Sequence, residues 1–592
     1  MKITRVQIEN YRNLRSVDAQ LDNLVALVGE NNSGKSNFLR AIALPFASDD
    51  NNFGKNLSWF DINNEAKAEY YAFIDARKAD ILDGSIDAET LCQHVPVITV
   101  VVDIQGSAAD GYDLKNLLVN ENNSPVARLR YRWLVGDAPK LLNLTKDLLA
   151  DGTDVCEIEM SLLPMNLYKH TIDVPDTIGG SRIPYETLSR FRHISLPAER
   201  DNFAASADRL GSRALVGLFQ SGIDANGQKS IEQGYGDLLS TIRKAAKLDA
   251  VINWQEYSNV PNAGDFFKKI SILPNMPQMS SILGSIRLGY SNESLAFQGL
   301  GHRNLILMAV MLNAYLNEDR DLSLRVVSVE EPEAHLCVNN VLLMASLLKV
   351  FGGKNTHTQI LYSTHDAELV NKVGLDRVIV LHGGTASSLK QELTADELDY
   401  LTNNPNTDIF KLLFSRRLIL VEGITEELLI KAYLQAHTAL NDVKVLSFHK
   451  GYRNIIKIWK KVNTGSHNRL GIVRDYDNQP KAKADHDALA DEQICVRTTA
   501  GYTLEEDIVK TGTNHALLVG KYGSIYGWEK MSDEDLQEDW RNNRKADVML
   551  KICQDLIAGE LAGFRMPQHI QDVLDFLLKP VDSGSSAESG IS

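Results

Sequence analysis

The strongest constraint on the fold is the glycine-rich segment GENNSGKS at residues 29–36, which lies between an apolar run and a helix-like run. It fits the pattern GxxxxGK[ST]; residues 24–28 before it predict a buried strand, and residues 37–44 after it predict a helix. In a strand–loop–helix unit of this kind, backbone N–H groups and the helix N-terminus converge on phosphate groups. The segment therefore predicts an α/β domain that binds a nucleotide.

The side chains of this segment have separate predicted roles. Lys35 would reach the terminal phosphates of ATP, and the hydroxyl of Ser36 would bind Mg²⁺. Glycine at the remaining key positions lets the backbone approach the phosphates closely. The further nucleotide contacts that we expect from this loop and its helix are Gly29, Asn32, Ser33, Gly34 and Asn37.

A second nucleotide-handling set lies far downstream. The run VVSVEE at residues 326–331 predicts a strand that ends in two carboxylates, which is costly unless a cation lies there. We expect Glu330 to hold the Mg²⁺ shell and Glu331 to polarise the attacking water. His365 follows a further predicted strand, where a sensor of the γ-phosphate is needed, although a lone histidine is more often structural. The loop at residues 332–336 is of the kind that crosses a dimer interface.

An acidic set occupies the last third of the chain. Glu422 follows the apolar run 417–421, and Glu426 lies four residues later at the start of a predicted helix. If that helix starts by Thr425, the Glu426 side chain can point back toward Glu422. An ordinary strand exit would give the same pattern, so these two residues alone are a weak signal.

Two aspartates, Asp475 and Asp477, continue the set after the predicted strand 469–473. Alternate residues at an extended strand end face the same way, and the carboxyl ends of parallel strands carry the ligands of an α/β sheet. The aspartates are therefore predicted to address one pair of Mg²⁺ or Mn²⁺ ions. Such a pair would stabilise the attacking and leaving oxygens of a phosphodiester. The alternative is that residues 475–478 form a surface turn.

Composition narrows the class of protein. A chain of 592 residues is expected to divide into roughly two to four domains. Its net charge of −15 argues against a protein that only coats nucleic acid, but not against a nuclease that holds DNA through metals. Five scattered cysteines without a CxxC pair favour a reducing cytoplasm. We expect neither a secretion signal nor a membrane span, because no apolar run approaches roughly 18 residues.

Hydrophobic patterning predicts how the chain is organised. Residues 1–201 and 279–405 are expected to form two parts of one ATPase domain around a helical insertion at 202–278. The insertion is either a self-association element or ordinary helical packing within one subunit. Strand and helix alternate in residues 411–580, which predicts a second α/β domain with a mostly parallel sheet, and residues 581–592 predict a disordered tail. Other predicted strands cover residues 3–9, 97–104, 127–134, 193–201, 281–288, 359–362 and 443–448, and the long predicted helices cover residues 304–316, 338–350 and 425–435.

The segment IENYRNL at residues 8–14 is similar to the first-strand signature of ABC-type ATPases of the SMC, RecF and Rad50 kind. This resemblance implies that Arg12 lies near the nucleotide. It also places the segment GLGHR in the signature-motif slot, where Gly299 and Gly301 would approach a nucleotide across a dimer. The chain departs from the pattern twice, because the serine of LSGGQ is missing and Glu330 stands where aspartate is usual.

The acidic set resembles the Toprim domain, which binds divalent metal through a glutamate and a DxD pair. An ABC-type ATPase followed by a Toprim domain is the order found in OLD (overcoming lysogenisation defect) family endonucleases, which include the Gabija-type antiphage nucleases. The resemblance covers most of the chain and implies two further site residues. Glu505 would be a metal ligand and Lys545 would lie near the scissile phosphate. Pro197 begins a segment similar to the one that precedes the dimerisation helices of that family.

The resemblance implies an ATP-regulated, divalent-metal-dependent DNA endonuclease or nickase of the cytoplasm that acts in antiphage defence. It also implies a homodimer or tetramer, with a possible accessory defence protein or nucleic acid. One alternative is an ATP-driven DNA-repair or structural-maintenance ATPase with a non-cleaving Toprim domain. The other is a nucleotide-controlled assembly sensor. The complete acidic set argues against the first alternative, and Glu331 argues against the second.

Overall fold

The structure is a computed structural model. It describes the chain except for residues 49–54, 108–109, 122–123, 151, 176–180, 199–214, 217, 221, 247–258, 263–265, 267–268, 270–276, 285, 287, 318–321, 355–356, 404–407, 437–441, 449–451 and 580–592. The predicted disordered tail and most of the segment that begins at Pro197 lie outside the described residues.

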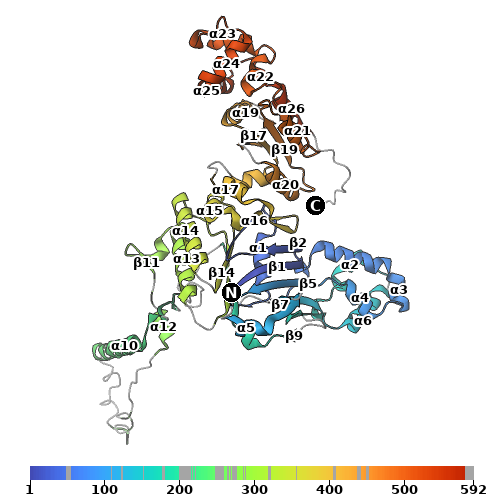
Figure 1. The fold of residues 1–592 in the computed structure, drawn as a ribbon. Coiled ribbons are helices and arrows are strands. Elements are labelled where there is room, and N and C mark those ends of the chain that lie inside the picture. Colours follow the sequence, from blue (N-terminus) through green and yellow to red (C-terminus); the bar gives the residue numbers. More distant parts are fainter. Residues whose placement is uncertain are drawn as a thin grey trace.

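The first layer is an antiparallel sheet with the strand order β2-β1-β5-β7-β8-β9, and β6 pairs with β7 beside this path. A cap of short helices covers one end of this sheet (Figure 1). The strands are β1 (Lys2–Tyr11), β2 (Leu14–Gln20), β5 (Ile98–Gln105), β6 (Leu118–Glu121), β7 (Ser124–Val135), β8 (Tyr168–Val174) and β9 (Ser181–Arg182). The helices are α2 (Asn64–Ala76), α3 (Lys78–Asp83), α4 (Ala88–His94), α5 (Gly111–Leu114), α6 (Ala138–Ala150), α7 (Glu159–Leu162) and α8 (Tyr185–Leu188).

The second layer is a sheet with the order β16-β15-β3-β14-β13-β10-β4, in which only β15 and β16 pair antiparallel. Its strands are β3 (Leu24–Val28), β4 (Ala47–Ser48), β10 (Phe191–Leu196), β13 (Leu324–Glu330), β14 (Thr358–Ser363), β15 (Val378–His382) and β16 (Thr385–Ser388). Its helices are α1 (Lys35–Ala43), α13 (Leu300–Asn317), α14 (Val338–Lys354), α15 (Ala367–Val373), α16 (Leu389–Glu392) and α17 (Ala395–Asn403). Strands from both predicted parts of the ATPase domain thus share one sheet.

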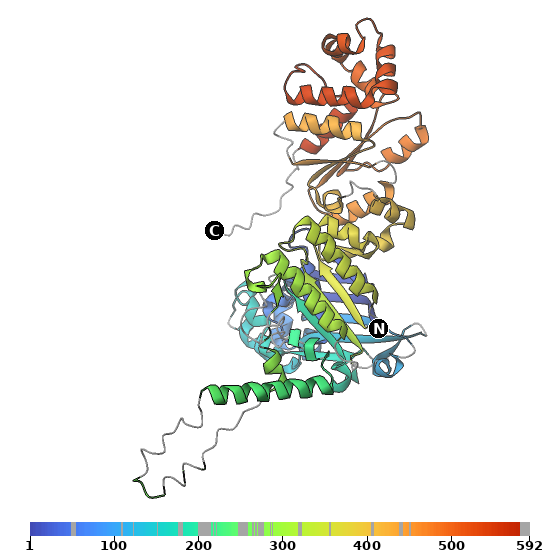
Figure 2. The same cartoon turned by 90° about the vertical axis from the view of Figure 1, so that its left-hand side faces the viewer.

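The predicted insertion contributes one long helix, α10 (Ala225–Ala245), which stands out from the rest of the chain (Figures 1 and 2). Two of its apolar residues, Leu238 and Ile242, are exposed in the single chain. The strand predicted at residues 281–288 is wrong: helix α12 (Met279–Leu283) covers its start, and the nearest strands are β11 (Gly289–Tyr290) and β12 (Glu293–Ser294). The short apolar run there fits both periodicities, so pattern alone could not separate them.

The C-terminal part is built on a four-stranded, wholly parallel sheet with the order β18-β17-β19-β20. This confirms the predicted alternation of strand and helix. The strands are β17 (Arg417–Val421), β18 (Val443–Ser447), β19 (Arg469–Arg474) and β20 (Ile494–Thr498). The helices are α18 (Ile409–Phe414), α19 (Ile424–Ala436), α20 (Tyr452–Val462), α21 (Pro480–Asp487), α22 (Leu504–Lys510), α23 (Asn514–Tyr526), α24 (Asp533–Asn543), α25 (Lys545–Ile557) and α26 (Gln568–Leu578).

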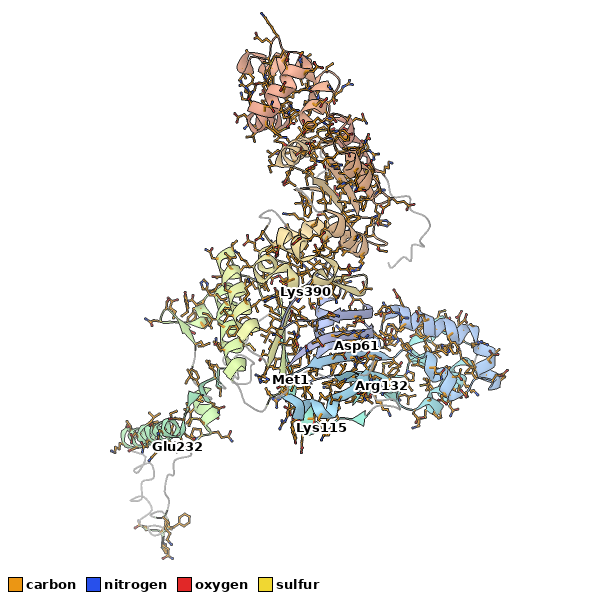
Figure 3. All side chains as sticks on the ribbon, viewed as in Figure 1. Met1, Asp61, Lys115, Arg132, Glu232 and Lys390 are labelled. Carbon is orange, nitrogen blue, oxygen red and sulfur yellow. The ribbon has the colours of Figure 1, made fainter. Side chains whose placement is uncertain are left out.

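Three clusters of buried apolar side chains hold these layers together. One joins the antiparallel sheet to one face of the mixed sheet, and another fills the face of the C-terminal sheet under α19 and α22–α26. The middle cluster is continuous from Val28 and Met344 in the second layer through Leu413 to Trp459 beside the C-terminal sheet. The ATPase part and the C-terminal part are therefore packed through one core. A polar contact also links α16 to the chain after β2. Lys390 Nζ, on the residue labelled in Figure 3, donates a hydrogen bond to Asp22 Oδ2 at 3.2 Å.

Among the described residues, no helix is both long and apolar enough to cross a membrane.

Candidate functional site

The glycine-rich loop connects β3 to α1 as predicted, and its backbone explains the glycines. Gly34 has φ 103°, a left-handed conformation, and a Cβ atom there would lie 2.8 Å from Leu14 Cδ2. A Cβ atom on Gly29 would lie 2.6 Å from the carbonyl oxygen of Leu381. Asn32 also has a positive φ of 66°, which asparagine tolerates better than most residues. The loop is therefore a tight turn that only this residue pattern adopts without strain.

Lys35 is buried at the start of α1, and its ammonium group closes the loop. Its Nζ donates hydrogen bonds to the carbonyl oxygens of Gly29, at 3.0 Å, and Glu30, at 2.8 Å. Burial lowers the pKa of Lys35, and the nearby carboxylate of Glu331 partly opposes this. Ser36 follows in the first turn of the same helix. The loop thus points one buried cation and a helix N-terminus toward the same space, as a phosphate requires.

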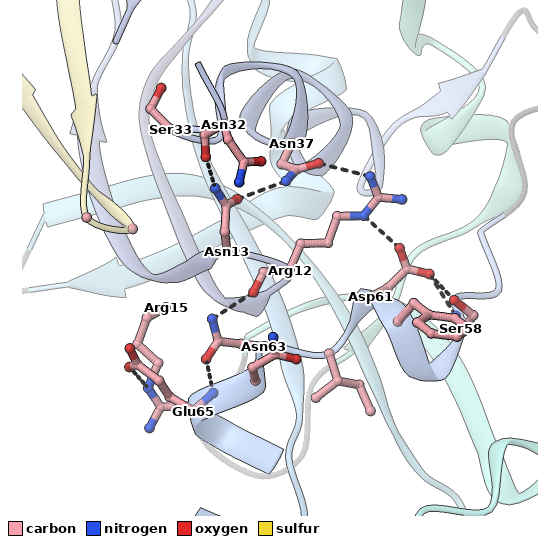
Figure 4. A pocket seen from close by; sticks show the side chains of 15 residues that line it. Arg12, Asn13, Arg15, Asn32, Ser33, Asn37, Ser58, Asp61, Asn63 and Glu65 are labelled. Carbon is pink, nitrogen blue, oxygen red and sulfur yellow. Dashed lines mark hydrogen bonds and ion pairs between the residues drawn. The ribbon is translucent and has the colours of Figure 1, made fainter. Parts of the chain in front are cut away.

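A cavity of about 740 Å³ opens beside this loop (Figure 4). Arg12 crosses it: Nε donates to Asp61 Oδ1 at 2.8 Å, and Nη1 donates to Asn37 Oδ1 at 2.9 Å. Asn37 in turn donates to Asn13 Oδ1 at 2.8 Å, and Asn13 donates to the carbonyl oxygen of Asn32 at 2.8 Å. A guanidinium is thus held at a fixed place beside the glycine-rich loop, and the contact of Arg12 with a nucleotide stays a prediction.

Strand β14 lies between β13 and β3, the strand that leads into the glycine-rich loop, so the end of β13 is close to that loop. Glu330 pairs with Ser363 in the parallel register, and Glu331 follows with φ 43°. His365 Nε2 lies 3.7 Å from Glu331 Oε1. Burial and then the charge of Lys35 lower the pKa of His365, and the charge of Glu331 opposes this. The structure therefore brings Lys35 close to Glu331 and His365, which follow it in the sequence by 296 and 330 positions.

Glu333 was missed in the sequence. Its Oε1 accepts hydrogen bonds from Thr364 Oγ1 at 2.7 Å and from the backbone N–H of His365 at 2.8 Å, so it fixes the loop that carries the histidine. Burial raises the pKa of Glu333. The sequence alone does not indicate this role, because the hydrogen-bond partners of Glu333 follow β14, whereas Glu333 follows β13.

The two glycines of the signature-motif slot differ in environment. A Cβ atom on Gly301 would lie 2.4 Å from the carbonyl oxygen of His335, whereas one on Gly299 would meet nothing within 4 Å among the described atoms. Asn304, one turn further along α13, donates to the carbonyl oxygen of Ala334 at 3.0 Å. Gly301 therefore lets α13 pack directly on the loop after Glu331. Its position in this chain is explained by packing, and its predicted nucleotide contact stays a prediction.

The acidic set gathers at the carboxyl edge of the C-terminal sheet. Glu422 follows β17, and its Oε2 accepts a hydrogen bond from the backbone N–H of Asp475, which follows the adjacent strand β19, at 3.2 Å. Glu426 on α19 and Glu505 on α22 are buried, with 3% and 0% of their surfaces exposed. Lys545, at the start of α25, places Nζ 3.0 Å from Glu505 Oε1. Five elements, β17, α19, β19, α22 and α25, thus bring these side chains to one place.

Electrostatics shows how closely the carboxylates are coupled. Burial, followed by the charges of Glu426 and Glu505, raises the pKa of Asp475 to about 8. Burial also raises the pKa of Glu426, with Lys545 opposing it. The attraction of these carboxylates raises the pKa of Lys545 despite its own burial. Four carboxylates around one lysine leave an excess of buried negative charge, which a cation would relieve.

The geometry expected for Asp477 is wrong. The strand β19 ends at Arg474, and Asp477 has φ 49°, so the chain turns instead of continuing as an extended strand. Its backbone N–H donates to the carbonyl oxygen of Tyr502 at 3.2 Å. Strand alternation therefore cannot align Asp477 with Asp475. Asp477 as a metal ligand stays a prediction that rests on the DxD pattern.

The donor set suits a hard divalent cation. Both carboxylate oxygens of Glu505 and Oδ1 of Asp475 are buried and accept no hydrogen bond from the described residues. Glu505 Oε1 forms an ion pair with Lys545. Oxygen donors of this kind are the ones Mg²⁺ prefers. Across the described part of the chain, no three His, Cys, Asp or Glu side chains already surround a common point closely enough to hold an ion. Side-chain adjustment would therefore have to accompany metal binding.

Asp507 and His569 were also missed, and they fix the segment before Glu505. Asp507 accepts hydrogen bonds from the backbone N–H groups of Ala500, at 2.8 Å, and Gly501, at 2.7 Å. His569 Nδ1 on α26 lies 3.0 Å from Asp507 Oδ2, and its interaction and these hydrogen bonds lower the pKa of Asp507 despite burial. In the run LEED at residues 504–507, Glu505 thus belongs to the acidic set, and Asp507 fixes the preceding turn.

Comparison with known proteins gives first a class. A family model described as an AAA ATPase domain matches residues 1–116, which carry the glycine-rich loop and the Arg12–Asp61 pair. The N-terminal part of the chain is therefore similar to an AAA ATPase domain, for which a nucleotide is the expected ligand.

Among curated proteins, the chain is similar to the endonuclease GajA of Bacillus cereus (strain HuB5-5), with 27% identity over 223 residues. This stretch is 31% of the chain and 32% of GajA, so the chain matches about a third of that relative's length. The similarity confirms the resemblance to the Gabija-type nucleases that the motifs predicted.

Two solved structures are also similar. An SMC head bound to the C-winged helix domain of ScpA is 13% identical, with a TM-score of 0.32, and the alignment covers 66% of this chain and 100% of that one. The SMC head domain from Thermotoga maritima is 14% identical, with a TM-score of 0.27, covering 65% and 98%. TM-scores this low do not establish a shared fold.

Proposed function

We propose that this protein is an ATP-regulated, divalent-metal-dependent DNA endonuclease or nickase. One observation carries the proposal: Glu422, Glu426, Asp475 and Glu505 converge with Lys545 at the carboxyl edge of a parallel sheet, in a chain that also has an ATPase domain. Similarity to an endonuclease supports it further. The order of an ABC-type ATPase and a Toprim domain is part of this proposal.

The residues have distinct proposed tasks at the C-terminal site. Glu422, Glu426, Asp475, Asp477 and Glu505 would hold Mg²⁺ or Mn²⁺. When bound, such ions supply Lewis-acid stabilisation of a phosphodiester and a reactive water at neutral pH. Lys545, which lies 3.0 Å from Glu505 in the chain alone, would turn toward a non-bridging phosphate oxygen of the substrate. The buried environment would strengthen each of these charge interactions.

ATP control is assigned to the N-terminal site. Lys35, Ser36 and Glu330 would hold the nucleotide and its Mg²⁺, Glu331 would orient the attacking water, and His365 would respond to the γ-phosphate. The short distance between His365 and Glu331 and their shared proximity to Lys35 support these tasks. The continuous apolar core between the two parts of the chain offers a physical path by which the nucleotide state could influence cutting.

The biological setting is proposed by similarity alone. GajA is an endonuclease, and the Gabija-type resemblance suggests antiphage defence with an accessory protein or nucleic acid. A homodimer or tetramer would form through the ATPase part and α10, whose exposed Leu238 and Ile242 need a partner to be buried. Nothing in this assignment requires a membrane.

One observation favours a second candidate, an ATPase whose C-terminal domain binds nucleic acid without cutting it. The described carboxylates do not surround a common ion position, and Lys545 forms an ion pair with Glu505. In that case Lys545 would stay paired with Glu505 when nucleic acid binds.

Cleavage of supercoiled plasmid separates the two candidates. Wild type in Mg²⁺ or Mn²⁺ should nick or linearise the plasmid, and Asp475→Ala should lower the rate by at least about a hundredfold, because a metal ligand is lost. Asp487→Ala, at an exposed aspartate of α21, is the matched control and should cut normally. Comparing cleavage with and without ATP shows whether ATP activates or inhibits cutting. Absence of metal-dependent cutting in every lane, with ATP hydrolysis intact, would favour the non-cleaving candidate.

A further inference from the structure

Arg474 is the last residue of β19, next to the acidic set but on the other face of the sheet. Successive residues of a strand face opposite sides, so Arg474 shares a face with Leu470 and Ile472, which pack in the middle core. Val473 belongs to the core on the opposite face, where Glu426 and Glu505 lie. The side chain of Arg474 is thus separated from the candidate metal site by the thickness of the sheet.

The side chain of Arg474 is buried, and one of its guanidinium nitrogens has no hydrogen-bond partner. Only 5% of the residue is exposed, and Nη1 is buried and has no hydrogen-bond partner. Across the described residues, no carboxylate lies within ion-pair distance of it, whereas Arg497 on the neighbouring strand pairs with Asp572 at 3.0 Å. A buried charged group without a partner destabilises the folded protein. Such a group is therefore expected mainly where a bound ligand of opposite charge pairs with it.

Thr498 supplies a second uncompensated group at the same place. It is the register partner of Arg474 across β19 and β20, so the two side chains lie on the same face. Its Oγ1 is also buried without a hydrogen-bond partner. The next residue differs: Thr499 Oγ1 accepts from the Tyr476 backbone N–H at 2.9 Å and donates to the Gly501 carbonyl oxygen at 3.0 Å. A guanidinium donor and a hydroxyl are thus left together at the carboxyl edge of a parallel sheet, where such sheets bind ligands.

We propose that Arg474 and Thr498 form a phosphate-binding subsite that holds a phosphate of a nucleic-acid strand away from the metal site. A phosphate suits the pair, because guanidinium groups donate two parallel hydrogen bonds to its oxygens and a hydroxyl can donate a third. The strand that carries this phosphate would cross the sheet edge with its scissile bond over the acidic set on the other face. The identity of the polymer rests on the proposed nuclease function, but the affinity for phosphate does not.

Thermal unfolding tests the subsite without requiring cleavage. Potassium phosphate, compared with potassium chloride at equal ionic strength, should raise the unfolding midpoint of wild type, because a ligand that binds only the folded state stabilises it. Arg474→Met should abolish this increase, and without phosphate it should unfold no earlier than wild type, because an unpaired buried charge has been removed. Arg497→Met is the control on the neighbouring strand and should keep the phosphate response.

DNA binding tests the polymer and the kind of phosphate. In a background of Asp475→Ala, Arg474→Met should weaken binding of duplex DNA about tenfold and reduce the salt dependence by about one phosphate contact. An equal loss for duplexes with 5′-hydroxyl and 5′-phosphate ends would assign a backbone phosphate. A loss confined to the 5′-phosphate duplex would assign a terminal phosphate.

Two results would overturn the proposal. In the first, Arg474→Met unfolds earlier than wild type without phosphate and both proteins respond equally to phosphate, which makes Arg474 a structural residue. In the second, phosphate stabilises neither protein and DNA affinity is unchanged. If phosphate binding is present but plasmid cleavage is absent, the subsite stands and only the nuclease assignment fails.

Discussion

At the scale of single residues, burial decides which groups can change charge. His193 lies on β10 of the second sheet, and its Nε2 is 2.8 Å from Ser328 Oγ on the neighbouring strand β13. Burial, with a smaller contribution from Lys55, lowers the pKa of His193 to about 3. The imidazole is therefore neutral in the folded protein at every pH at which the chain is expected to work.

This predicts an acid-sensitive stability. Between pH 6.5 and 3 the unfolded chain takes up a proton at His193 and the folded chain does not, so stability falls as the pH decreases. From pH 7 to pH 5 the loss should be about 2 kcal/mol from this residue. Urea unfolding at the two pH values measures it. His193→Gln should reduce the difference, and His467→Gln, at an exposed histidine, should leave it unchanged. Parallel pH dependence in all three proteins would contradict the account.

Close packing gives a second prediction at this scale. Gly301→Ala should destabilise the chain by about 1–3 kcal/mol, because the added methyl would lie 2.4 Å from the His335 carbonyl oxygen. The same change at Gly299 meets open space and should have little effect on the thermal unfolding midpoint. An equal midpoint for both variants would show that α13 does not pack on the loop as described.

At the scale of elements, the turn between β1 and β2 is joined to a short 3₁₀ helix at residues 59–61. The link is the Arg12–Asp61 pair, supported by Ser58, whose Oγ donates to Asp61 Oδ2 at 2.8 Å. The Asn63 side chain also donates to the carbonyl oxygen of Arg12 at 2.7 Å. These contacts fix the guanidinium before any nucleotide arrives, which reduces the ordering cost of binding.

Asp61→Asn should therefore weaken ATP binding about tenfold through a loss of positioning of Arg12. Calorimetric titration with ATP measures the change. Asp18→Asn is a matched control, because Asp18 pairs with Arg5 on the exposed face of the same sheet and lies outside the cavity. Equal affinities for wild type and Asp61→Asn would show that Arg12 does not need this partner.

At the scale of the whole molecule, the middle apolar core joins the ATPase part to the C-terminal sheet. Leu412 and Leu413 on α18 and Ile455 and Trp459 on α20 belong to the same cluster as the helices of the second sheet. The predicted boundary between residues 405 and 411 is therefore a change from one sheet to another, and the apolar core continues across it. The two sheets are expected to unfold together rather than as separate units.

An isolated C-terminal segment, residues 408–579, should consequently expose apolar surface. It should bind the dye ANS strongly and self-associate, whereas the full chain should bind little. Dye fluorescence and light scattering at equal molar concentration measure this. If the segment is monomeric and does not bind ANS, the shared core contributes little to its stability.

The sequence predicted the elements that carry local signals and missed those that depend on distant contacts. Strand–loop–helix patterning located β3 and α1, and apolar runs located β13 and β17. The pairing of Arg12 with Asp61 could not be predicted, because a turn and a helix 49 positions apart meet only after folding. Asp477 was misplaced because its positive φ interrupts a pattern that strand periodicity would continue.

We propose that the buried acidic cluster cuts DNA, and two neighbouring glutamates of α22 offer a matched test of this proposal. Glu505 is fully buried in the cluster, whereas Glu506 caps the backbone N–H of Tyr502 at 2.6 Å and pairs with Lys510 outside it. The measurement is the rate of Mg²⁺-dependent plasmid cleavage by Glu505→Gln and Glu506→Gln. We expect a loss of at least about a hundredfold for Glu505→Gln and of less than about threefold for Glu506→Gln. Equal rates in the two variants would contradict it.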